Sequence, residues 1–245
     1  MDYQKGEFLY EGKAKRIFRV TNQSELVWLE YKDSLTAFNA LKKGSFEGKG
    51  SLNCRMTTLI FKYLEKHGVQ THLQASLSDS EMVCRKLTII PAEVVVRNIL
   101  AGSTAKKFGI EEGRPLAQPL VEFYYKNDEL ADPFMSDDQA LMMKVVSRQE
   151  ELDELKSSAL KIDQLLTEFF AALDIQLVDF KLEFGRTSDG RLQLGDEITP
   201  DSCRLWDMKT GEKMDKDRFR RDLGNVEEYY QEVHRRMQNR WEKEI

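Results

Sequence analysis

The sequence predicts an α+β protein with two lobes, a small β-rich N-terminal lobe and a larger α/β lobe that follows it. Short strand-like runs separated by turns come first in the chain, and the long amphipathic helices come later. A junction near residues 87–91, where Pro91 follows an apolar run, separates the two kinds of pattern. We therefore expect domains at residues 1–88 and 89–245, with a ligand cleft between the lobes.

Composition limits the class of protein. The 245 residues are 41% hydrophobic and 32% charged, which is typical of a globular protein rather than a disordered one. The formal net charge of −5 argues against nucleic acid as the main partner, because there is no surplus of cations to neutralise phosphates. No apolar run suits a signal peptide or a membrane span, so we expect no membrane partner. The cysteines are scattered and odd in number, which favours a reducing cytoplasm over a disulfide framework: Cys54, Cys84 and Cys203.

Three short strands are expected at residues 8–10, 16–20 and 26–31. The turn between the first two carries a glycine and two lysines, in the order Gly12, Lys13, Ala14 and Lys15. The glycine permits close approach of a phosphate to the backbone, and the lysines supply positive charge. The turn is therefore either a nucleotide-phosphate loop or a solvated hairpin tip, and its sequence alone does not choose between them.

Residues 33–50 are polar and contain glycines, so we expect a long loop there, and long loops in compact domains are often functional. Ser51 is the expected N-cap of the helix that follows, and Lys66, His67 and Gly68 end it. Residues 81–87 should form another strand.

An arginine interrupts the apolar, β-branched run at residues 93–99, which predicts a buried strand. Because a buried Arg97 needs an anionic partner, it is either a structural ion-pair residue or part of an anion site. Gly102 and Ser103 follow, and Ser103 is expected to cap a short helix whose backbone N–H groups could also bind an anion.

The second half of the chain predicts one strand and two long helices. The strand covers residues 121–126, and a capping-box pattern at residues 147–150 should open the longest helix. Asp215 is expected to cap a turn that carries Lys216 and Arg220. A last helix follows Gly224, and we expect His234, beside its apolar face, to be packed rather than catalytic.

A hairpin at residues 177–206 gathers most of the charge that could do chemistry. On its first arm the side chains of Asp179, Lys181 and Glu183 share one face of the strand, and a turn at residues 188–190 brings the chain back. The return arm carries a second charged set, namely Asp196, Glu197, Asp201 and Arg204. Two carboxylates on neighbouring strands suit Mg²⁺, although a solvated face with cross-strand ion pairs is the alternative. Simple alternation puts Asp196 on the apolar face, unless a bulge at Gly195 turns it around.

Several motifs in order resemble one known family, the SAICAR synthetases (phosphoribosylaminoimidazole-succinocarboxamide synthases) of the short bacterial type. The resemblance covers nearly the whole chain and rests on these motifs: YEGKAKRIF, TAFN, KG with a following asparagine, PAEVVVRNILAGS, KND, VDFKLEFG, LGDEITPDSCRLWD and KDRFR. Each motif is weak by itself, and the specificity comes from their order and spacing.

The resemblance implies an ATP-dependent ligase of de novo purine biosynthesis. Such an enzyme joins 5-aminoimidazole-4-carboxylate ribonucleotide (CAIR) to L-aspartate, with Mg²⁺ as cofactor, by phosphorylating the CAIR carboxylate and letting the aspartate amine attack the acyl phosphate. The resemblance also implies a kinase-like small lobe, an ATP-grasp-like arrangement around the cleft, and a homodimer. The sequence shows no Ser/His/Asp or Cys/His pattern, which agrees with a reaction that depends on positioning and fixed charge.

Roles follow from the resemblance, residue by residue. The residues implied in ATP binding are Gly12, Lys13, Ala14, Lys15, Lys86 and Lys126. Glu183 and Asp196 would hold Mg²⁺. The residues implied in substrate binding are Arg97, Ser103, Asp132, Lys181, Asp201, Arg204, Lys216 and Arg220, among which Lys181 and Arg97 are the catalytic candidates.

Two positions depart from the family pattern. Cys54 replaces an expected asparagine and puts a loop contact in doubt, and Ala131 replaces a histidine near Asp132.

Two other functions are alternatives to the ligase. A kinase-like phosphotransferase would need a glycine-rich loop with several glycines and an HRD-type loop, which the sequence lacks. A nucleotide-binding module without chemistry would bind ATP regardless of CAIR and aspartate.

Overall fold

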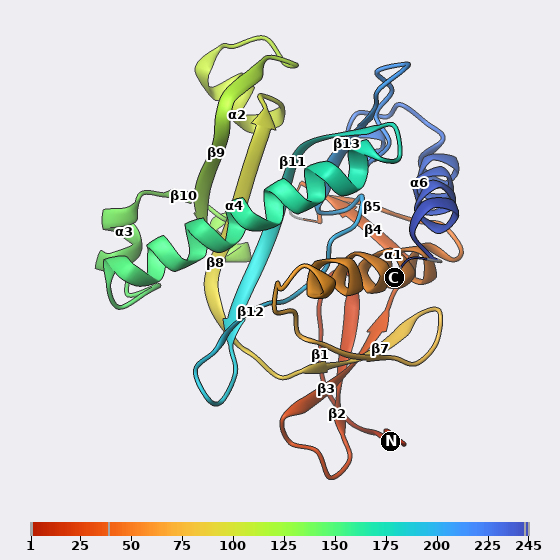
Figure 1. The fold of residues 1–245 in the computed structure, drawn as a ribbon, viewed down its shortest axis with the longest axis vertical. Helices are drawn as coiled ribbons and strands as arrows, with labels where there is room; N and C mark the ends of the chain where they lie inside the picture. Colours follow the sequence, from red (N-terminus) through yellow and green to blue (C-terminus); the bar gives the residue numbers. More distant parts are fainter. Residues whose placement is uncertain (1, 39, 243, 245) are drawn as a thin grey trace.

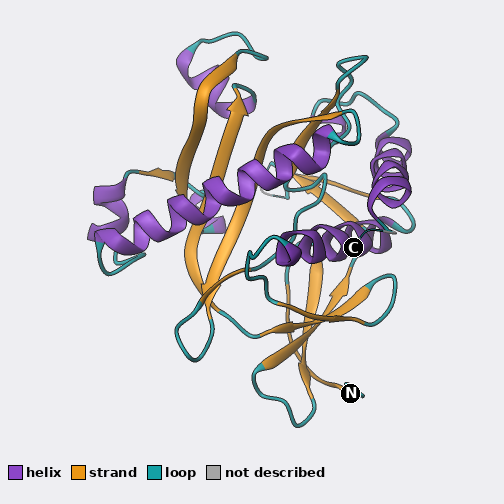
Figure 2. Cartoon of the chain, viewed as in Figure 1, coloured by secondary structure: helices purple, strands orange, loops and turns teal. Residues whose placement is uncertain are grey.

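The computed structural model describes residues 2–38, 40–242 and 244, so Asn39 of the TAFN motif lies outside the described residues. The fold mixes antiparallel sheets with helices (Figures 1 and 2). One sheet uses strands up to Arg85, and the next begins at Thr88. The change of sheet lies close to residues 87–91, and the division into two domains stays a prediction.

The first sheet has five antiparallel strands in the order β1-β2-β3-β7-β6. They are β1 (Lys5–Glu11), β2 (Lys15–Val20), β3 (Leu26–Tyr31), β6 (Leu73–Ser76) and β7 (Glu81–Arg85). Helix α1 (Lys49–Lys66) packs across this sheet because its apolar stripe faces β3, β6 and β7 (Figure 1). The expected strands are confirmed, and β6 is one that the sequence analysis missed.

The expected loop at residues 33–50 is wrong in part. It contains an antiparallel hairpin of β4 (Ser34–Ala37) and β5 (Lys42–Ser45). The hairpin has little apolar content on β5, so the alternation that signals a strand is weak there. Lys42 fastens it to the far end of the chain by donating to the carbonyl of Phe219 at 2.6 Å.

The second sheet has the order β10-β9-β8-β11-β12, with β13 also paired to β11. Its strands are β8 (Thr88–Ile99), β9 (Pro115–Tyr125), β10 (Phe134–Met135), β11 (Ile175–Arg186), β12 (Leu192–Leu194) and β13 (Cys203–Asp207). Helix α4 (Gln149–Ala171) crosses one face of the sheet and buries its stripe there (Figure 1). The other face of β8 and β11 is left for polar side chains.

The remaining helices are short except for the last one. They are α2 (Gly102–Phe108), the 3₁₀ helix η1 (Asp128–Leu130), α3 (Asp137–Met142), α5 (Asp217–Arg220) and α6 (Val226–Trp241). Helix α6 packs on α1, the helix that covers the first sheet (Figure 2). Tyr63, Phe169 and Trp241 join α1, α4 and α6, with Trp241 stacked on Phe169 at 5.1 Å between ring centroids. His234 is buried on α6, as expected.

Three predicted helix caps are wrong. Helix α1 begins at Lys49 rather than after Ser51, because the carboxylate of Asp33 accepts the backbone N–H groups of Gly48 and Gly50 from a distance in sequence. Ser103 lies inside α2 rather than at its cap. Helix α4 has no side-chain cap. The capping box that does form joins Ser136 and Gln139 at the start of α3.

The hairpin of β11 and β12 is confirmed, and the position of Asp196 has a local explanation. The chain leaves β12 after Leu194, and Asp196 takes a left-handed conformation with φ of 55°. A left-handed residue turns its side chain out of the strand alternation. A left-handed residue after the strand, rather than a bulge at Gly195, therefore brings Asp196 to the polar face.

Among the described residues, no helix is long and apolar enough to span a membrane.

We expect the core under α4 to dominate stability. Leu155→Ala, at a fully buried position, should lower the free energy of unfolding by about 2–5 kcal/mol through lost burial and the cavity left behind. Leu160→Ala on the same helix, where the side chain is 40% exposed, should change it by less than about 1 kcal/mol. Denaturant unfolding monitored by circular dichroism measures both. Equal losses for the two variants would contradict this description of the core.

Candidate active site

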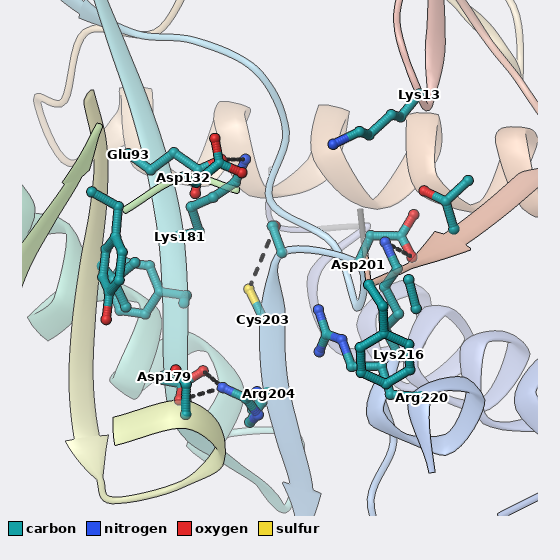
Figure 3. Close-up of a pocket in the computed structure, with 18 of the residues that line it drawn as sticks. Lys13, Glu93, Asp132, Asp179, Lys181, Asp201, Cys203, Arg204, Lys216 and Arg220 are labelled. Carbon is teal, nitrogen blue, oxygen red and sulfur yellow. Dashed lines mark hydrogen bonds and ion pairs between the residues drawn. The ribbon is translucent and has the colours of Figure 1, made fainter. Parts of the chain in front are cut away.

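A polar cavity of about 380 Å³ lies against the free face of β8, β11 and β13. The β4–β5 hairpin, the glycine turn between β1 and β2, and α5 complete its walls (Figure 3). The sequence-predicted site residues that line it come from many separate segments: Lys13, Arg97, Ser103, Asp132, Lys181, Asp201, Arg204, Lys216 and Arg220. Folding thus brings nine of the predicted residues to one cavity.

Asp179 sits between two arginines at one end of this cavity. The strand register places it opposite Arg97 on β8 and opposite Arg204 on β13. Arg97 donates to Asp179 at 2.8 Å, and Arg204 donates to both oxygens of the same carboxylate at 2.8 and 3.0 Å. Glu122 accepts from Nε of Arg97 at 2.6 Å, so this buried arginine has two anionic partners. Arg97 is therefore both an ion-pair residue and a wall of the cavity.

Gly102, at the start of α2, lies directly on Arg204. It has a φ of 60°, and a Cβ atom there would come within 2.4 Å of the guanidinium group. A side chain at this position would push Arg204 away from Asp179, so the turn needs glycine for both its conformation and its close approach. Ser103 follows at the exposed rim of the same cavity.

Lys181 is the centre of a second charge cluster. Its ammonium group donates to Glu93 at 2.8 Å and to Glu183 at 2.7 Å, and it lies 3.8 Å from Asp196. Burial alone lowers the pKa of Lys181, but the attraction of these three carboxylates outweighs burial and holds the pKa well above its usual value. Lys126 also donates to Glu183, at 2.7 Å. The lysine thus stays protonated and charged.

Lys15 reaches the same cluster from the glycine turn. Its ammonium group donates to Asp196 at 2.7 Å and to Glu197 at 2.9 Å. Burial raises the pKa of Asp196, but the attraction of Lys15 and Lys181 is stronger and lowers it below the usual range. Asp196 is therefore ionised, with lysines from both sheets around it.

The carboxylates of Glu183 and Asp196 suit a magnesium ion chemically, because both offer oxygen donors and both approach one ammonium group, that of Lys181. Within residues 2–38, 40–242 and 244, no group of three or more acidic, histidine or cysteine side chains is arranged to hold a metal ion. A two-carboxylate site fits Mg²⁺ that takes its other ligands from phosphate and water.

Asp201 lies on the opposite wall of the cavity from Lys181 (Figure 3). It accepts hydrogen bonds from Lys49, from Asn53 at 3.0 Å and from Tyr230 at 2.6 Å. Sequence reasoning missed Lys49. The signal was present, because Lys49 lies three residues before the buried Leu52 and so falls on the apolar stripe of α1. A lysine on such a stripe needs a buried carboxylate.

Some predicted site residues lie outside the lining of the cavity. Gly12 and Ala14 form the turn itself, and the exposed Lys86 is held by its backbone N–H, which donates to the carbonyl of Glu25.

Two residues of the lining hold neighbouring segments in place. Asp132 accepts the backbone N–H of Asn127 at 2.9 Å. Lys13 donates to Asp128 at 2.7 Å, which links the glycine turn to η1.

The two departures from the family pattern have different surroundings. Cys54 is buried inside α1, and burial raises the pKa of its thiol to about 12, so it remains a neutral thiol. Ala131 is exposed and takes a left-handed conformation with φ of 60° just before Asp132. Neither residue belongs to the lining of the cavity.

The fold and the cavity define a protein that binds small anionic molecules, with lysines and arginines held in place by buried carboxylates. The family model of SAICAR synthetase matches residues 8–237. The chain belongs to the SAICAR synthetase family.

Relatives and solved structures agree with this membership. The chain is 52% identical over 237 residues to a phosphoribosylaminoimidazole-succinocarboxamide synthase from Halalkalibacterium halodurans, covering 97% of this chain and 99% of that protein. The synthase of the same name from Ehrlichia chaffeensis has a crystal structure that superposes with a TM-score of 0.91 at 45% identity, covering 94% and 98% of the two chains. A SAICAR synthetase (Type-2) in complex with ADP superposes with a TM-score of 0.91 at 42% identity, covering 95% and 98%.

The buried Asp217 makes a pH-dependent contribution to stability. Arg204 donates to it at 3.0 Å and Arg220 at 2.6 Å. Burial raises the pKa of Asp217, but the two arginines outweigh burial and lower it from 3.8 to about 2. Because the folded-state pKa is depressed, the stabilisation is present above pH 3.8 and is lost as the pH falls towards 2.

We therefore expect Asp217→Asn to cost at least about 2 kcal/mol of unfolding free energy at pH 7, and the cost to shrink between about pH 4 and pH 2. Denaturant unfolding across this pH range measures the difference from the unmodified protein. Asp222→Asn is the matched control, since that side chain is 84% exposed and pairs with Lys42. A cost for Asp217→Asn that stays constant with pH would contradict the assigned ion pairs.

Proposed function

We propose that this chain is an ATP-dependent carbon–nitrogen ligase that condenses CAIR with L-aspartate to give SAICAR, ADP and phosphate in de novo purine biosynthesis. The observation that carries the proposal is the convergence of cations from separate segments on one cavity: Lys13, Arg97, Lys181, Arg204, Lys216 and Arg220. All three substrates are anionic, so such a cavity is what their binding requires. The solved structure of a SAICAR synthetase in complex with ADP supports the binding of the nucleotide.

The nucleotide is proposed to bind beside the glycine turn. Lys13 and Lys15 reach over from the first sheet, and Lys126 reaches from the end of β9, so the triphosphate would lie among three ammonium groups. Gly12 and Ala14 allow the turn to approach the phosphates closely, and Lys86 lies near the adenine by family resemblance. Mg²⁺, held by Glu183 and Asp196, supplies charge neutralisation on the phosphate oxygens when it is bound.

CAIR is proposed to occupy the end of the cavity near Asp179. Arg97, Ser103 and Arg204 would bind it, and Lys216 and Arg220 would close on its phosphate. These cations do not have to move far to meet an anion, because their carboxylate partners already hold them at the wall. Asp201 and Asp132 border the same space, and Asp132 is proposed to help position an amine.

The chemistry that fits this arrangement needs no protein nucleophile. The carboxylate of CAIR would take the γ-phosphoryl group, and the aspartate amine would then attack the acyl phosphate and release phosphate. Lys181, held protonated by Glu93 and Glu183, would stabilise negative charge that develops on the transferred group. The contribution of the protein is positioning and fixed charge.

We propose further that the chain divides into two lobes, residues 1–88 and 89–245, with a kinase-like small lobe and an ATP-grasp-like cleft. The change of sheet between Arg85 and Thr88 supports the boundary. The contact of α6 with α1 implies that the C-terminal helix braces the smaller lobe. Family resemblance also supports a homodimer in the cytoplasm, and sedimentation velocity of the purified protein tests the oligomeric state.

The decisive assay follows ADP and SAICAR formation with ATP and Mg²⁺, adding CAIR alone, L-aspartate alone, and then both. We expect full turnover only when both are present. ADP release with CAIR alone would support an acyl phosphate that water intercepts. If ATP binds but no mixture turns over, the chain is a nucleotide-binding module, and if ATP is consumed without SAICAR, a phosphotransferase becomes the better description.

The metal assignment predicts a difference between two neighbouring glutamates that both contact Lys181. Glu183→Gln should lower kcat by about 100-fold or more and raise the Mg²⁺ concentration needed for half-maximal rate, because a ligand carboxylate is lost. Glu93→Gln is the matched control and should leave the Mg²⁺ dependence unchanged. Turnover and Mg²⁺ dependence of Glu183→Gln equal to those of the unmodified enzyme would overturn the assignment.

A further inference from the structure

Lys49 is a buried lysine at the N-terminus of a helix, and both its burial and its position are unfavourable for a positive charge. It is 1% exposed, and it is the first residue of α1, where the positive end of the helix dipole disfavours a cation. The first turn of this helix contains no acidic residue to offset the charge. Because an unpaired buried ammonium group is costly, the position of Lys49 depends on a partner outside the helix.

That partner is Asp201, whose two carboxylate oxygens are both engaged. Oδ2 accepts from Lys49 and from Asn53, both on α1. Oδ1 accepts from the hydroxyl of Tyr230 on α6. Three donors from behind the cavity wall thus engage both oxygens of a carboxylate that lies on the cavity.

Lys216 lies on the cavity side of the same carboxylate and does not share in these bonds. Its ammonium group is 4.0 Å from Oδ1 of Asp201, which is too far for a hydrogen bond. Within the described part of the chain, this is the one carboxylate within ion-pair distance of Lys216. Figure 3 shows Lys216 beside Asp201 and Arg220 on one wall of the cavity. Lys216 therefore keeps its hydrogen-bonding capacity for a ligand.

We propose that Lys49 is a positioning residue that neutralises Asp201 from the buried side and so leaves the ammonium group of Lys216 free to bind the phosphate of the substrate. The proposal rests on the function proposed above, in which Lys216 and Arg220 close on the phosphate of CAIR. It adds a residue that touches no substrate. Its effect passes through Asp201, because a carboxylate without Lys49 would turn its charge towards the nearest other cation.

The charges around Lys216 agree with this geometry. Burial lowers the pKa of Lys216 most, and the attraction of Asp201 and, more weakly, of Glu197 raises it. Arg220 and Lys49 lower it further, and the net pKa is below the usual value for lysine. These four groups come from α1, α5 and the segment between β12 and β13. Removal of Lys49 should therefore raise the pKa of Lys216.

Lys49→Met is the principal test, because methionine keeps much of the length of the side chain and removes its charge. We expect KM for CAIR to rise about tenfold while kcat changes by less than about twofold, since the loss falls on binding of the phosphate. We also expect the alkaline limb of the kcat/KM profile to move to higher pH, because Lys216 then faces Asp201 without a competing cation.

Tyr230→Phe is a second variant in case Lys49→Met does not fold. It removes the hydroxyl group that occupies Oδ1, the oxygen closest to Lys216, and it leaves the charge of the site unchanged. We expect the same direction of change with a smaller size, about threefold in KM for CAIR. Tyr229→Phe, at the neighbouring position, should leave KM unchanged, because its ring lies against Arg218 rather than Asp201.

Met56→Ala separates positioning from stability. Met56 is fully buried on the same helix, so this variant should lower the melting temperature with little change in KM or in the pH profile. Unchanged KM and an unmoved alkaline limb in both Lys49→Met and Tyr230→Phe would overturn the proposal, as would equal kinetic changes in Met56→Ala. An unmodified enzyme that does not turn over CAIR and aspartate would instead overturn the proposed function.

Discussion

The site depends first on the carboxylate of Asp179, which holds Arg97 and Arg204 side by side at the end of the cavity. Two guanidinium groups this close repel each other unless an anion lies between them. The register of three antiparallel strands supplies that anion, because β11 pairs with β8 on one side and with β13 on the other. Arg204 also donates to Asp217 on α5, and Asp217 accepts from Arg220 on the same helix. A chain of ion pairs thus sets the cationic wall.

The same principle explains how a chain with a net charge of −5 can present a cationic cavity. Several of the carboxylates that pair with these cations are buried, namely Glu122, Asp179, Glu183 and Asp217. Lys181 has three carboxylates around it, and Lys15 has two. Each ion pair offsets the cost of removing its charges from water, and the fixed cations are then in place before a ligand arrives. Local pairing, rather than net charge, decides what the cavity can bind.

Prediction from sequence succeeded where the signal was periodic and failed where it depended on distant groups. The stripe of α4 and the alternation of β11 appear as expected, because burial of one face is enough to produce each pattern. The start of α1 was misplaced because its N–H groups are satisfied by Asp33, outside the helix. The place of Lys49 on the apolar stripe of α1 is a local signal, but its partner Asp201 lies far along the chain and has none.

By itself the sequence determined the first three strands, the long helices α4 and α6, the family, and the residue types available for chemistry. These follow from local periodicity, turn residues and motif order, which need no knowledge of distant contacts. Only the tertiary structure decided that Asp179 pairs with two arginines, that Asp196 turns to the lysine cluster at a φ of 55°, and that Asp201 is hydrogen-bonded from behind. Charge pairing acts through space over a few ångströms, so which partners meet is set by strand register and helix packing.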